Sequence, residues 1–417
     1  MSNLTIELSY ALDTFYFLMC TVLVMWMAAG FAMLEAGLVR SKNTVEILNK
    51  NALLYGIACV AYLLVGYNIM YPANPVSSVI PGLDFLLGAD NTIESVTAGG
   101  EDAPYYSNMA DFIFQAVFAA ATMSIVSGAV AERMRLWPFL IFAVVMVSVI
   151  YPVEGYWKWG GGFLDELGFQ DFAGSVVVHM AGAAAALAAV ILVGPRKGKY
   201  GPNGQVRAIP GANLPMATLG MFILWMGWFG FNGGSELKIA NVEEANAVAK
   251  IFVNTNAAAA AGMVVAALFA RTLFGKTDLT MTINGALAGL VAITAEPLAP
   301  DAGTASLIGG VGGLVVVLSV LALDKLKLDD PVGAISVHGA AGIWGIFAVL
   351  ISNPDATFMG QLIGTAVTFA WMFFASYIVL LIIKATMGLR ASEEEEMEGM
   401  DVYECGMEAY PEFTSGK

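Results

Sequence analysis

The sequence predicts an all-α polytopic membrane protein with eleven transmembrane helices. Of its 417 residues, 58% are hydrophobic and 13% are charged, and the mean hydropathy is +0.73. Charged residues divide the chain into apolar stretches near the roughly 20 residues that an α-helix needs to cross a bilayer. Two of these stretches carry the only two histidines at matching positions. That match predicts an inverted five-helix repeat, followed by an extra C-terminal helix.

The eleven candidate spans are the apolar intervals between charged residues. They lie at residues 14–34, 51–71, 112–131, 136–153, 172–195, 213–232, 251–270, 279–295, 302–323, 333–353 and 356–383. The eighth, with its apolar core from Thr280 to Ala295, is short. The N-terminus has no basic segment, so no cleaved signal peptide is expected. The predicted organisation is a transmembrane domain at 1–385 and an acidic cytosolic tail at 386–417.

Basic residues predict the orientation of the chain in the membrane. With eleven spans, 16 of the 19 Lys and Arg residues fall in one alternate set of loops and the tail. Only Lys158, Lys238 and Lys250 fall in the opposite set. Cytoplasmic loops carry an excess of Lys and Arg. We therefore expect a multi-pass protein of the cytoplasmic membrane, with its N-terminus outside and its C-terminus in the cytosol.

The two histidine segments have Asp, Gly, Val and His in the same order at the same spacing. The matched residues are Asp171, Gly174, Val178 and His179 in the fifth span and Asp330, Gly333, Val337 and His338 in the tenth. Repeat one would run from about 10 to 195 and repeat two from about 208 to 353, with span eleven at 356–385. Two halves with odd numbers of helices have opposite topology, which would bring His179 and His338 together. A histidine at membrane depth indicates a functional site, and a satisfied core histidine is the alternative.

Charge and cysteine content limit the functions that the chain can have. The net charge is −15, with nine acidic residues after Ala391 and an acidic predicted outer loop at 71–106. Such a loop concentrates cations, unless it is merely solvated. Cys20, Cys59 and Cys405 indicate no disulfide framework. We see no nucleophile, metal cluster or phosphate loop, so we expect neither an enzyme nor a cofactor, and no nucleic-acid partner.

Aromatic residues gather at the predicted outer ends of the spans. Phe114 and Phe118 are four residues apart and share a helix face, and glycines alternate with aromatics around Trp159 and Phe231. An interfacial aromatic belt is the alternative, although Phe lacks the polar group of Trp and Tyr. Cation–π attraction supplies about 0.5–2 kcal/mol per ring, against a cost on the order of 20 kcal/mol for a bare ion in an apolar core. A small cation that can release its proton avoids most of that cost, and imidazoles can pass the proton on.

Several motifs, in order along the chain, resemble those of the Amt/Mep/Rh ammonium transporters, in the bacterial or archaeal Amt branch. The resemblance extends from the first span to the tail. The motifs are Phe114-Gln-Ala-Val-Phe118, Trp159-Gly-Gly-Gly162, Asp171-Phe-Ala-Gly-Ser-Val-Val-Val-His179, Trp228-Phe-Gly-Phe231-Asn-Gly-Gly-Ser235, Leu287-Ala-Gly-Leu-Val-Ala-Ile-Thr294, Asp329-Asp-Pro331, Val337-His338-Gly339 and Gly388-Leu-Arg390. The resemblance implies a homotrimer with one pore per subunit in a lipid bilayer.

The same resemblance implies roles at the outer end of that pore. Phe114, Trp159 and Ser235 would bind ammonium, or methylammonium as an analogue. Asp171 would shape this site from a buried position. From the residues alone, Asp171 also reads as the N-cap of the fifth span, and the two roles are compatible.

Deeper in the pore, the resemblance implies a gate of stacked rings, Phe118 and Phe231, above the pore-lining His179 and His338. Trp228 would pack beside the histidines. Ammonium would lose a proton below the gate and ammonia would pass the histidines. The proton would either follow along the pair, which makes transport electrogenic, or return outside. An ammonium sensor with a transporter fold and little flux is the alternative function.

Two segments depart from the family's usual pattern. Glu35 stands where the family usually has an aromatic residue. It either pairs at the interface with Arg40 or Lys42, or adds a second titratable group close to the histidine pair. In the tail, Cys405-Gly-Met replaces the common His-Gly-Glu. Regulation by a PII-type signal protein at the cytosolic face is a family trait that would use this tail.

Overall fold

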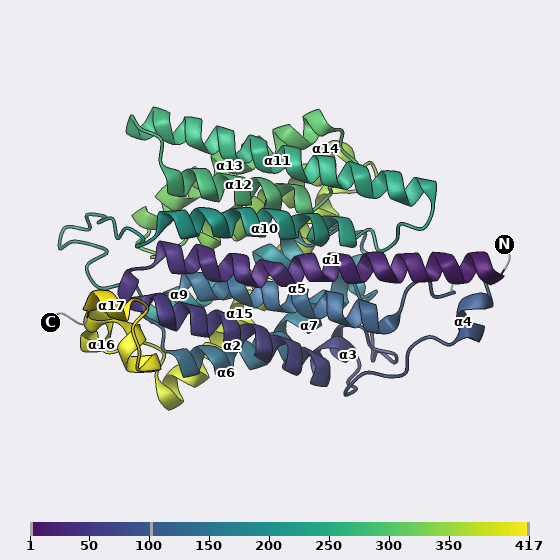
Figure 1. The fold of residues 1–417 in the computed structure, drawn as a ribbon, viewed down its shortest axis with the longest axis horizontal. Helices are drawn as coiled ribbons and strands as arrows, with labels where there is room; N and C mark the ends of the chain where they lie inside the picture. Colours follow the sequence, from purple (N-terminus) through teal and green to yellow (C-terminus); the bar gives the residue numbers. More distant parts are fainter. Residues whose placement is uncertain (1–2, 101–102, 415–417) are drawn as a thin grey trace.

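The computed structural model describes residues 3–100 and 103–414, and its elements are helices that run along one axis of a single bundle (Figure 1). Within these residues, ten helical stretches are long and apolar enough to cross a membrane. They are α1 (Asn3–Leu38), Ser41–Met70 with α2 (Thr44–Ala61), η2 (Tyr62–Gly66) and α3 (Tyr67–Met70), α5 (Asn108–Ala129), Leu136–Glu166 with α6 (Leu136–Val145), η3 (Met146–Ile150), α7 (Tyr151–Lys158) and α8 (Phe163–Glu166), Ser175–Val193 with η4 (Ser175–Met180) and α9 (Ala181–Val193), α10 (Leu214–Gly234), α11 (Val242–Phe274), α13 (Ala302–Lys325), Ile335–Ser352 with η5 (Ile335–Ala340) and α14 (Ala341–Ser352), and α15 (Phe358–Met387).

The eighth predicted span corresponds to α12 (Leu279–Thr294), an apolar helix of 16 residues that is shorter than the other ten stretches. Each predicted span therefore contains a helix. The all-helical membrane fold is confirmed, whereas the membrane crossing of α12 and the inverted symmetry of the two halves stay predictions. Within the Ser41–Met70 stretch, η1 (Ser41–Asn43) precedes α2. Small helices outside the spanning stretches are α4 (Ile93–Thr97), α16 (Glu393–Glu398), η6 (Asp401–Cys405) and α17 (Pro411–Thr414).

Some helices extend beyond the intervals that charge defined, and α1 is the clearest case. The predicted span began at residue 14, after Asp13, but the helix begins at Asn3. Asp13 is 4% exposed, and its Oδ1 accepts the backbone N–H groups of Ile239 and Ala240 at 2.6 and 2.8 Å. A carboxylate whose hydrogen bonds are made in this way does not end a helix.

Small residues allow α11, α12 and α13 to approach closely. A Cβ on Gly309 would overlap the carbonyl oxygen of Ala258, and a Cβ on Gly313 would overlap that of Gly262. Membrane helices without a strong hydrophobic drive to associate gain contact by such close packing. The glycines of these helices thus set the spacing of the second half of the bundle.

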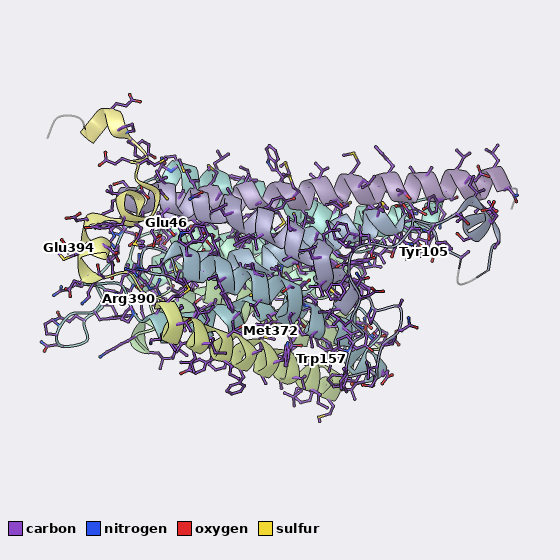
Figure 2. All side chains as sticks on the ribbon, turned by 90° about the horizontal axis from the view of Figure 1, so that it is seen from below. Glu46, Tyr105, Trp157, Met372, Arg390 and Glu394 are labelled. Atoms are coloured by element: carbon purple, nitrogen blue, oxygen red, sulfur yellow. The ribbon has the colours of Figure 1, made fainter. Side chains whose placement is uncertain are left out.

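The N-terminus and the tail lie at opposite ends of the bundle (Figures 1 and 2). We call the end that carries α16 and α17 the tail-side face. Glu46, Arg390 and Glu394 lie there, and Tyr105 lies at the other end (Figure 2).

Basic loops from distant parts of the sequence meet the acidic tail on the tail-side face. Arg135 pairs with Glu395 at 2.9 Å, and Lys197 pairs with Glu393 at 2.9 Å. Ion pairs of this kind place the predicted basic loops together. The assignment of this face to the cytosol stays a prediction.

Candidate functional site: a histidine pair under stacked aromatic rings

The two histidines are in contact. His179 lies in η4 and His338 in η5, the π-helical turns that lead into α9 and α14. Their Nδ1 atoms are 3.2 Å apart and their ring centroids 5.1 Å. His179 is 1% exposed and His338 4%. Because one Nδ1 must donate and the other accept, the protonation of one ring fixes the tautomer of its neighbour.

The same local structure precedes both histidines. Gly174 and Gly333 have φ angles of 107° and 82°, a region in which L side chains are strained. The carboxylate of Asp171 accepts four backbone N–H groups, those of residues 174–177, at 2.8–3.1 Å. Asp330 accepts two backbone N–H groups at 2.7 and 3.1 Å. The predicted capping role of Asp171 is thus visible in its hydrogen bonds, and Asp330 repeats it in the second segment.

Aromatic rings form a continuous column that leads to the histidines. Phe118 and Phe231 stack with ring centroids 4.0 Å apart and planes inclined by 20°. On one side of this stack the Phe114 ring lies 4.6 Å from Phe118, and on the other His179 lies 5.2 Å from Phe231. All four side chains are buried, so these phenylalanines are not part of a lipid-facing belt.

Trp159 and Ser235 adjoin the outer end of the column. The Trp159 ring lies edge-on to Phe118 at 6.1 Å, and its Nε1 donates to the backbone carbonyl of Asp171 at 3.1 Å. Ser235 follows Phe231 by one helical turn, and its hydroxyl donates to the Phe231 carbonyl at 2.8 Å. The Ser235 oxygen therefore keeps lone pairs that can accept a hydrogen bond from a cation.

Trp228 packs on the histidine pair from the side. Its ring stacks on His179 at 4.9 Å, with 25° between the planes. Its Nε1 donates to the Thr294 hydroxyl at 2.7 Å. Thr294, which fixes this ring, closes the Leu287–Thr294 motif, but the sequence alone assigned it no function.

Glu35 is buried and faces the interior of the bundle. It is 1% exposed, and its Oε2 accepts from the Asn51 amide at 3.0 Å and from the Ser127 hydroxyl at 2.7 Å. In the part of the chain that the structure describes, its other oxygen, Oε1, has no hydrogen-bond partner.

The interpretation of Glu35 as a partner of Arg40 or Lys42 is wrong. Arg40 pairs with Glu132 at 2.6 Å, and the Lys42 ammonium donates to the backbone carbonyl of Glu396 at 3.0 Å. Both cations are thus engaged at the tail-side face. The reason is tertiary, because the acceptors come from segments far along the chain.

Two cavities lie on the tail side of the histidines. A small one touches both His338 and Glu35, and a vestibule of about 530 Å³ opens beyond it. Asn284 lines both cavities, and Ser336 lines the vestibule. The Oδ1 of Asn284 and the Oγ of Ser336 are buried without a partner among the described residues. Sequence reasoning missed both side chains, because an isolated Asn or Ser in an apolar helix carries no pattern.

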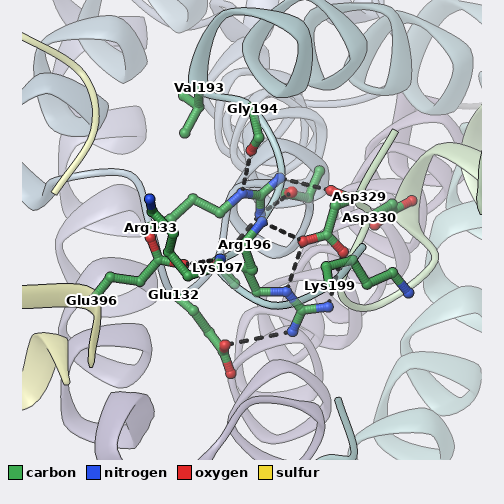
Figure 3. A network of polar contacts seen from close by, with 12 residues as sticks. Glu132, Arg133, Val193, Gly194, Arg196, Lys197, Lys199, Asp329, Asp330 and Glu396 are labelled. Atoms are coloured by element: carbon green, nitrogen blue, oxygen red, sulfur yellow. Dashed lines mark hydrogen bonds and ion pairs between the residues drawn. The ribbon is translucent and has the colours of Figure 1, made fainter. Parts of the chain in front are cut away.

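A buried cluster of charges joins the two halves of the chain near the vestibule (Figure 3). Arg196 pairs with Asp329 through Nε at 2.9 Å and Nη2 at 3.0 Å, and its Nη1 lies 3.5 Å from Glu132. Arg133 donates to the backbone carbonyl of Asp329 at 2.6 Å. We call Glu132, Arg133, Arg196 and Asp329 the charge clamp. It fixes the loop that precedes η5, and with it the position of His338.

These features define a polytopic α-helical membrane protein with a buried, aromatic-capped histidine pair at the core of its bundle. Residues 15–410 match the family model described as Ammonium Transporter Family, so the chain belongs to the ammonium transporter family. Its relatives include a putative ammonium transporter, sll1017, of Synechocystis sp., 41% identical over 96% of this chain and 89% of the relative. Ammonium transporter Amt2 of Archaeoglobus fulgidus is 40% identical, with the same coverage of both chains.

Solved structures share the fold. A protein described as Sensor Amt Protein superposes with a TM-score of 0.87 at 34% identity, over 96% of this chain and 99% of its own. Candida albicans Mep2 superposes with a TM-score of 0.81 at 28% identity, over 97% of this chain and 92% of its own. The family is one of membrane transport proteins, and these likenesses span nearly the whole chain.

Proposed function

We propose that this chain carries ammonium across the cytoplasmic membrane through a pore lined by His179 and His338. The observation that carries the proposal is the stack of Phe118 and Phe231, 4.0 Å apart, directly beside His179 in a buried column. Rings packed this closely leave no room for a hydrated ion. Ammonium captured outside therefore gives up its proton, and ammonia passes the apolar stretch.

The first step of the proposed cycle is capture at the outer end of the column. The faces of Phe114 and Trp159 attract a cation, and the Ser235 oxygen accepts a hydrogen bond from one of its N–H groups. Asp171 is fully committed to backbone N–H groups. It acts on the cation through its charge and through the position it gives to Trp159.

The second step is relay of the proton along the histidine pair. A hydrogen bond of 3.2 Å between the two Nδ1 atoms lets one ring accept a proton while the other releases one. Charge then accompanies each ammonium, and transport is electrogenic. This route gives the two buried imidazoles a function that neutral ammonia alone would not require.

Reconstituted liposomes test the proposal with ammonium, methylammonium and potassium. We expect currents with ammonium and methylammonium and none with potassium. His179→Asp and His338→Ala should abolish or alter the current and weaken discrimination against potassium, while the protein still assembles. The exposed Glu243→Gln serves as the control that should leave transport unchanged. Wild-type currents and selectivity in both histidine variants would show that the pair is structural.

A second candidate function is supported by the likeness to the protein described as Sensor Amt Protein. In that case the pore binds ammonium and transports little of it. Saturable ammonium binding with no measurable uptake in liposomes would favour the sensor.

We also propose that the tail-side face is cytosolic and that three copies assemble, each with its own pore. A reporter fused after Lys199 should then be cytosolic, and one inserted near Asp90 external. The tail is held to the bundle by Arg135–Glu395 at 2.9 Å and by the Asp401 carboxylate, which accepts the Glu46 N–H at 2.8 Å. A PII-type protein that binds at this face would compete with these contacts.

A further inference from the structure

The small cavity on the tail side of His338 has polar side chains in an otherwise apolar lining. Its lining is mostly apolar, yet it includes His338, Glu35 and Asn284. The space open to the centre of a water molecule is about 10 Å³, close to the minimum that one water requires. A cavity of this size with these polar side chains in its lining can hold one water between the imidazole and the carboxylate.

Glu35 turns one oxygen toward its protein partners and leaves one free. Asn51 and Ser127 hold Oε2, and Oε1 has no partner among the described residues. Gly128 lies against the side chain: a Cβ there would come within 3.4 Å of the Glu35 Cγ. The carboxyl group is thus fixed in orientation, with one oxygen available to a water or a proton.

Charges near Glu35 do not neutralise it. Lys50 is fully buried one helix away, but it pairs with Glu46 at 2.8 Å, so the two cancel. His338 is the other titratable group that lines the cavity. A carboxyl group at membrane depth without a dedicated cation is a candidate for proton transfer.

Asn284 and Val332 lie between the small cavity and the vestibule on the tail side. Asn284 lines the small cavity and also the 530 Å³ vestibule, and its Oδ1 is unpartnered within the described chain. A polar atom therefore stands at the boundary between the two spaces. Glu35 and Asn284 together form a polar route from His338 to the vestibule.

We propose that Glu35 is a proton-binding residue that takes the proton from the histidine pair and releases it to the vestibule. The protonated His338 gives a proton to the water in the small cavity, and that water gives one to Oε1 of Glu35. The imidazole returns to its neutral form and the carboxylate becomes a carboxylic acid. Release past Asn284 restores the carboxylate. This inference rests on the proposed electrogenic transport and extends it to the tail side of the pore.

The test uses current and methylammonium uptake measured on the same liposomes as a function of pH. Glu35→Gln keeps the shape of the side chain and removes its titration. We expect its current to fall on the order of 100-fold, the lower end of what a positioned acid–base group contributes. Methylammonium uptake without charge persists. Glu35→Asp keeps a carboxyl group and should restore current with a shifted pH dependence, and Glu243→Gln should match the wild type.

A second variant and a spectroscopic measurement cover the case in which Glu35→Gln fails to assemble. Asn284→Leu leaves Glu35 in place and removes the polar step to the vestibule, so current should fall while uptake persists. Infrared difference spectra should show a carboxylic C=O band that appears during turnover in the wild type and shifts in Glu35→Asp.

The outcomes separate the two proposals. Wild-type current and pH dependence in Glu35→Gln, in a protein that transports ammonium, would overturn the role of Glu35 alone. Equal losses of current and uptake in all three variants, without the infrared band, would make Glu35 and Asn284 structural. A wild-type protein with neither current nor uptake would overturn the proposed function and the relay with it.

Discussion

Individual side chains of the candidate site are held by partners that leave one chemical group available. Ser235 donates its hydroxyl proton to a backbone carbonyl and keeps its lone pairs, and Glu35 has one bonded oxygen and one without a partner among the described residues. Trp159 is fixed by its Nε1 and presents its ring beside Phe118. Such half-satisfied groups are preorganised for a ligand, because their orientation is set before it arrives.

The outer site can be tested with a double substitution. Trp159→Leu combined with Ser235→Ala should raise the half-saturation concentration for ammonium about tenfold, with less effect on the maximum rate. In the proposed cycle both groups act on the cation before it loses its proton, and a desolvated cation–π contact alone contributes up to about 2 kcal/mol. Concentration-dependent currents measure both quantities. An unchanged half-saturation would assign these residues to packing.

At the scale of the element, each histidine depends on a capped turn. Asp171 and Asp330 satisfy backbone N–H groups at the start of η4 and η5, and a glycine with positive φ lets the chain turn into the helix. These caps fix the start of each π-helical turn and with it the position of its histidine. Burial without capping would leave several N–H groups unpaired at membrane depth, which is costly.

Asp171→Asn is a sharp test of this element. The amide oxygen can still accept N–H groups, but the amide NH₂ cannot, so bonds to two of the four are lost. We expect a loss of about 3 kcal/mol in the free energy of unfolding, since hydrogen bonds to charged groups contribute about 1.5–3 kcal/mol each. Thermal unfolding in detergent measures it. Asp301→Asn, at the exposed cap of α13, should leave stability nearly unchanged, because Asn caps a helix about as well as Asp.

Across the whole molecule, the charge clamp joins segments that the sequence keeps far apart. Burial acts to raise the pKa of Asp329, but the hydrogen bonds and charge of Arg196, with Arg133 nearby, outweigh it and hold that pKa at about 2. An unfolded Asp has a pKa of about 3.9. The stabilisation is therefore fully present above about pH 4 and is lost as the pH falls through about 2.

Asp329→Asn should destabilise the protein by about 3–5 kcal/mol at neutral pH, because the buried Arg196 then keeps only its longer contact with Glu132, at 3.5 Å, as an ion pair. The stability of the variant should also fall less steeply below about pH 4, because the asparagine does not titrate. Unfolding midpoints over a pH series measure both effects. Asp324→Asn is the matched control, because its pair with Lys199 is partly exposed and contributes about 0–1 kcal/mol. Equal effects of the two substitutions would contradict the importance of burial.

Much of the fold and part of the site follow from the sequence alone. Hydropathy and the spacing of charges located a helix for every predicted span, because lipid requires each crossing segment to satisfy its own backbone. The spacing from Asp to His, repeated in the two halves, predicted the contact of His179 and His338. The four-residue spacing of Phe114 and Phe118 predicted that they share one helix face. These features depend on residues a few positions apart.

Only the tertiary structure decided what fills the space on the tail side of the histidines. Glu35 meets Ser127, 92 residues away, instead of the nearby Arg40, which is taken by Glu132. Asn284 joins two cavities because α12 packs beside η5, and Arg196 finds Asp329 across 133 residues. Local pattern fixes which face of a helix is apolar, but not which distant helix meets it. Partners of buried polar groups are chosen by packing, and the packing of this chain places a carboxyl group beside its histidine pair.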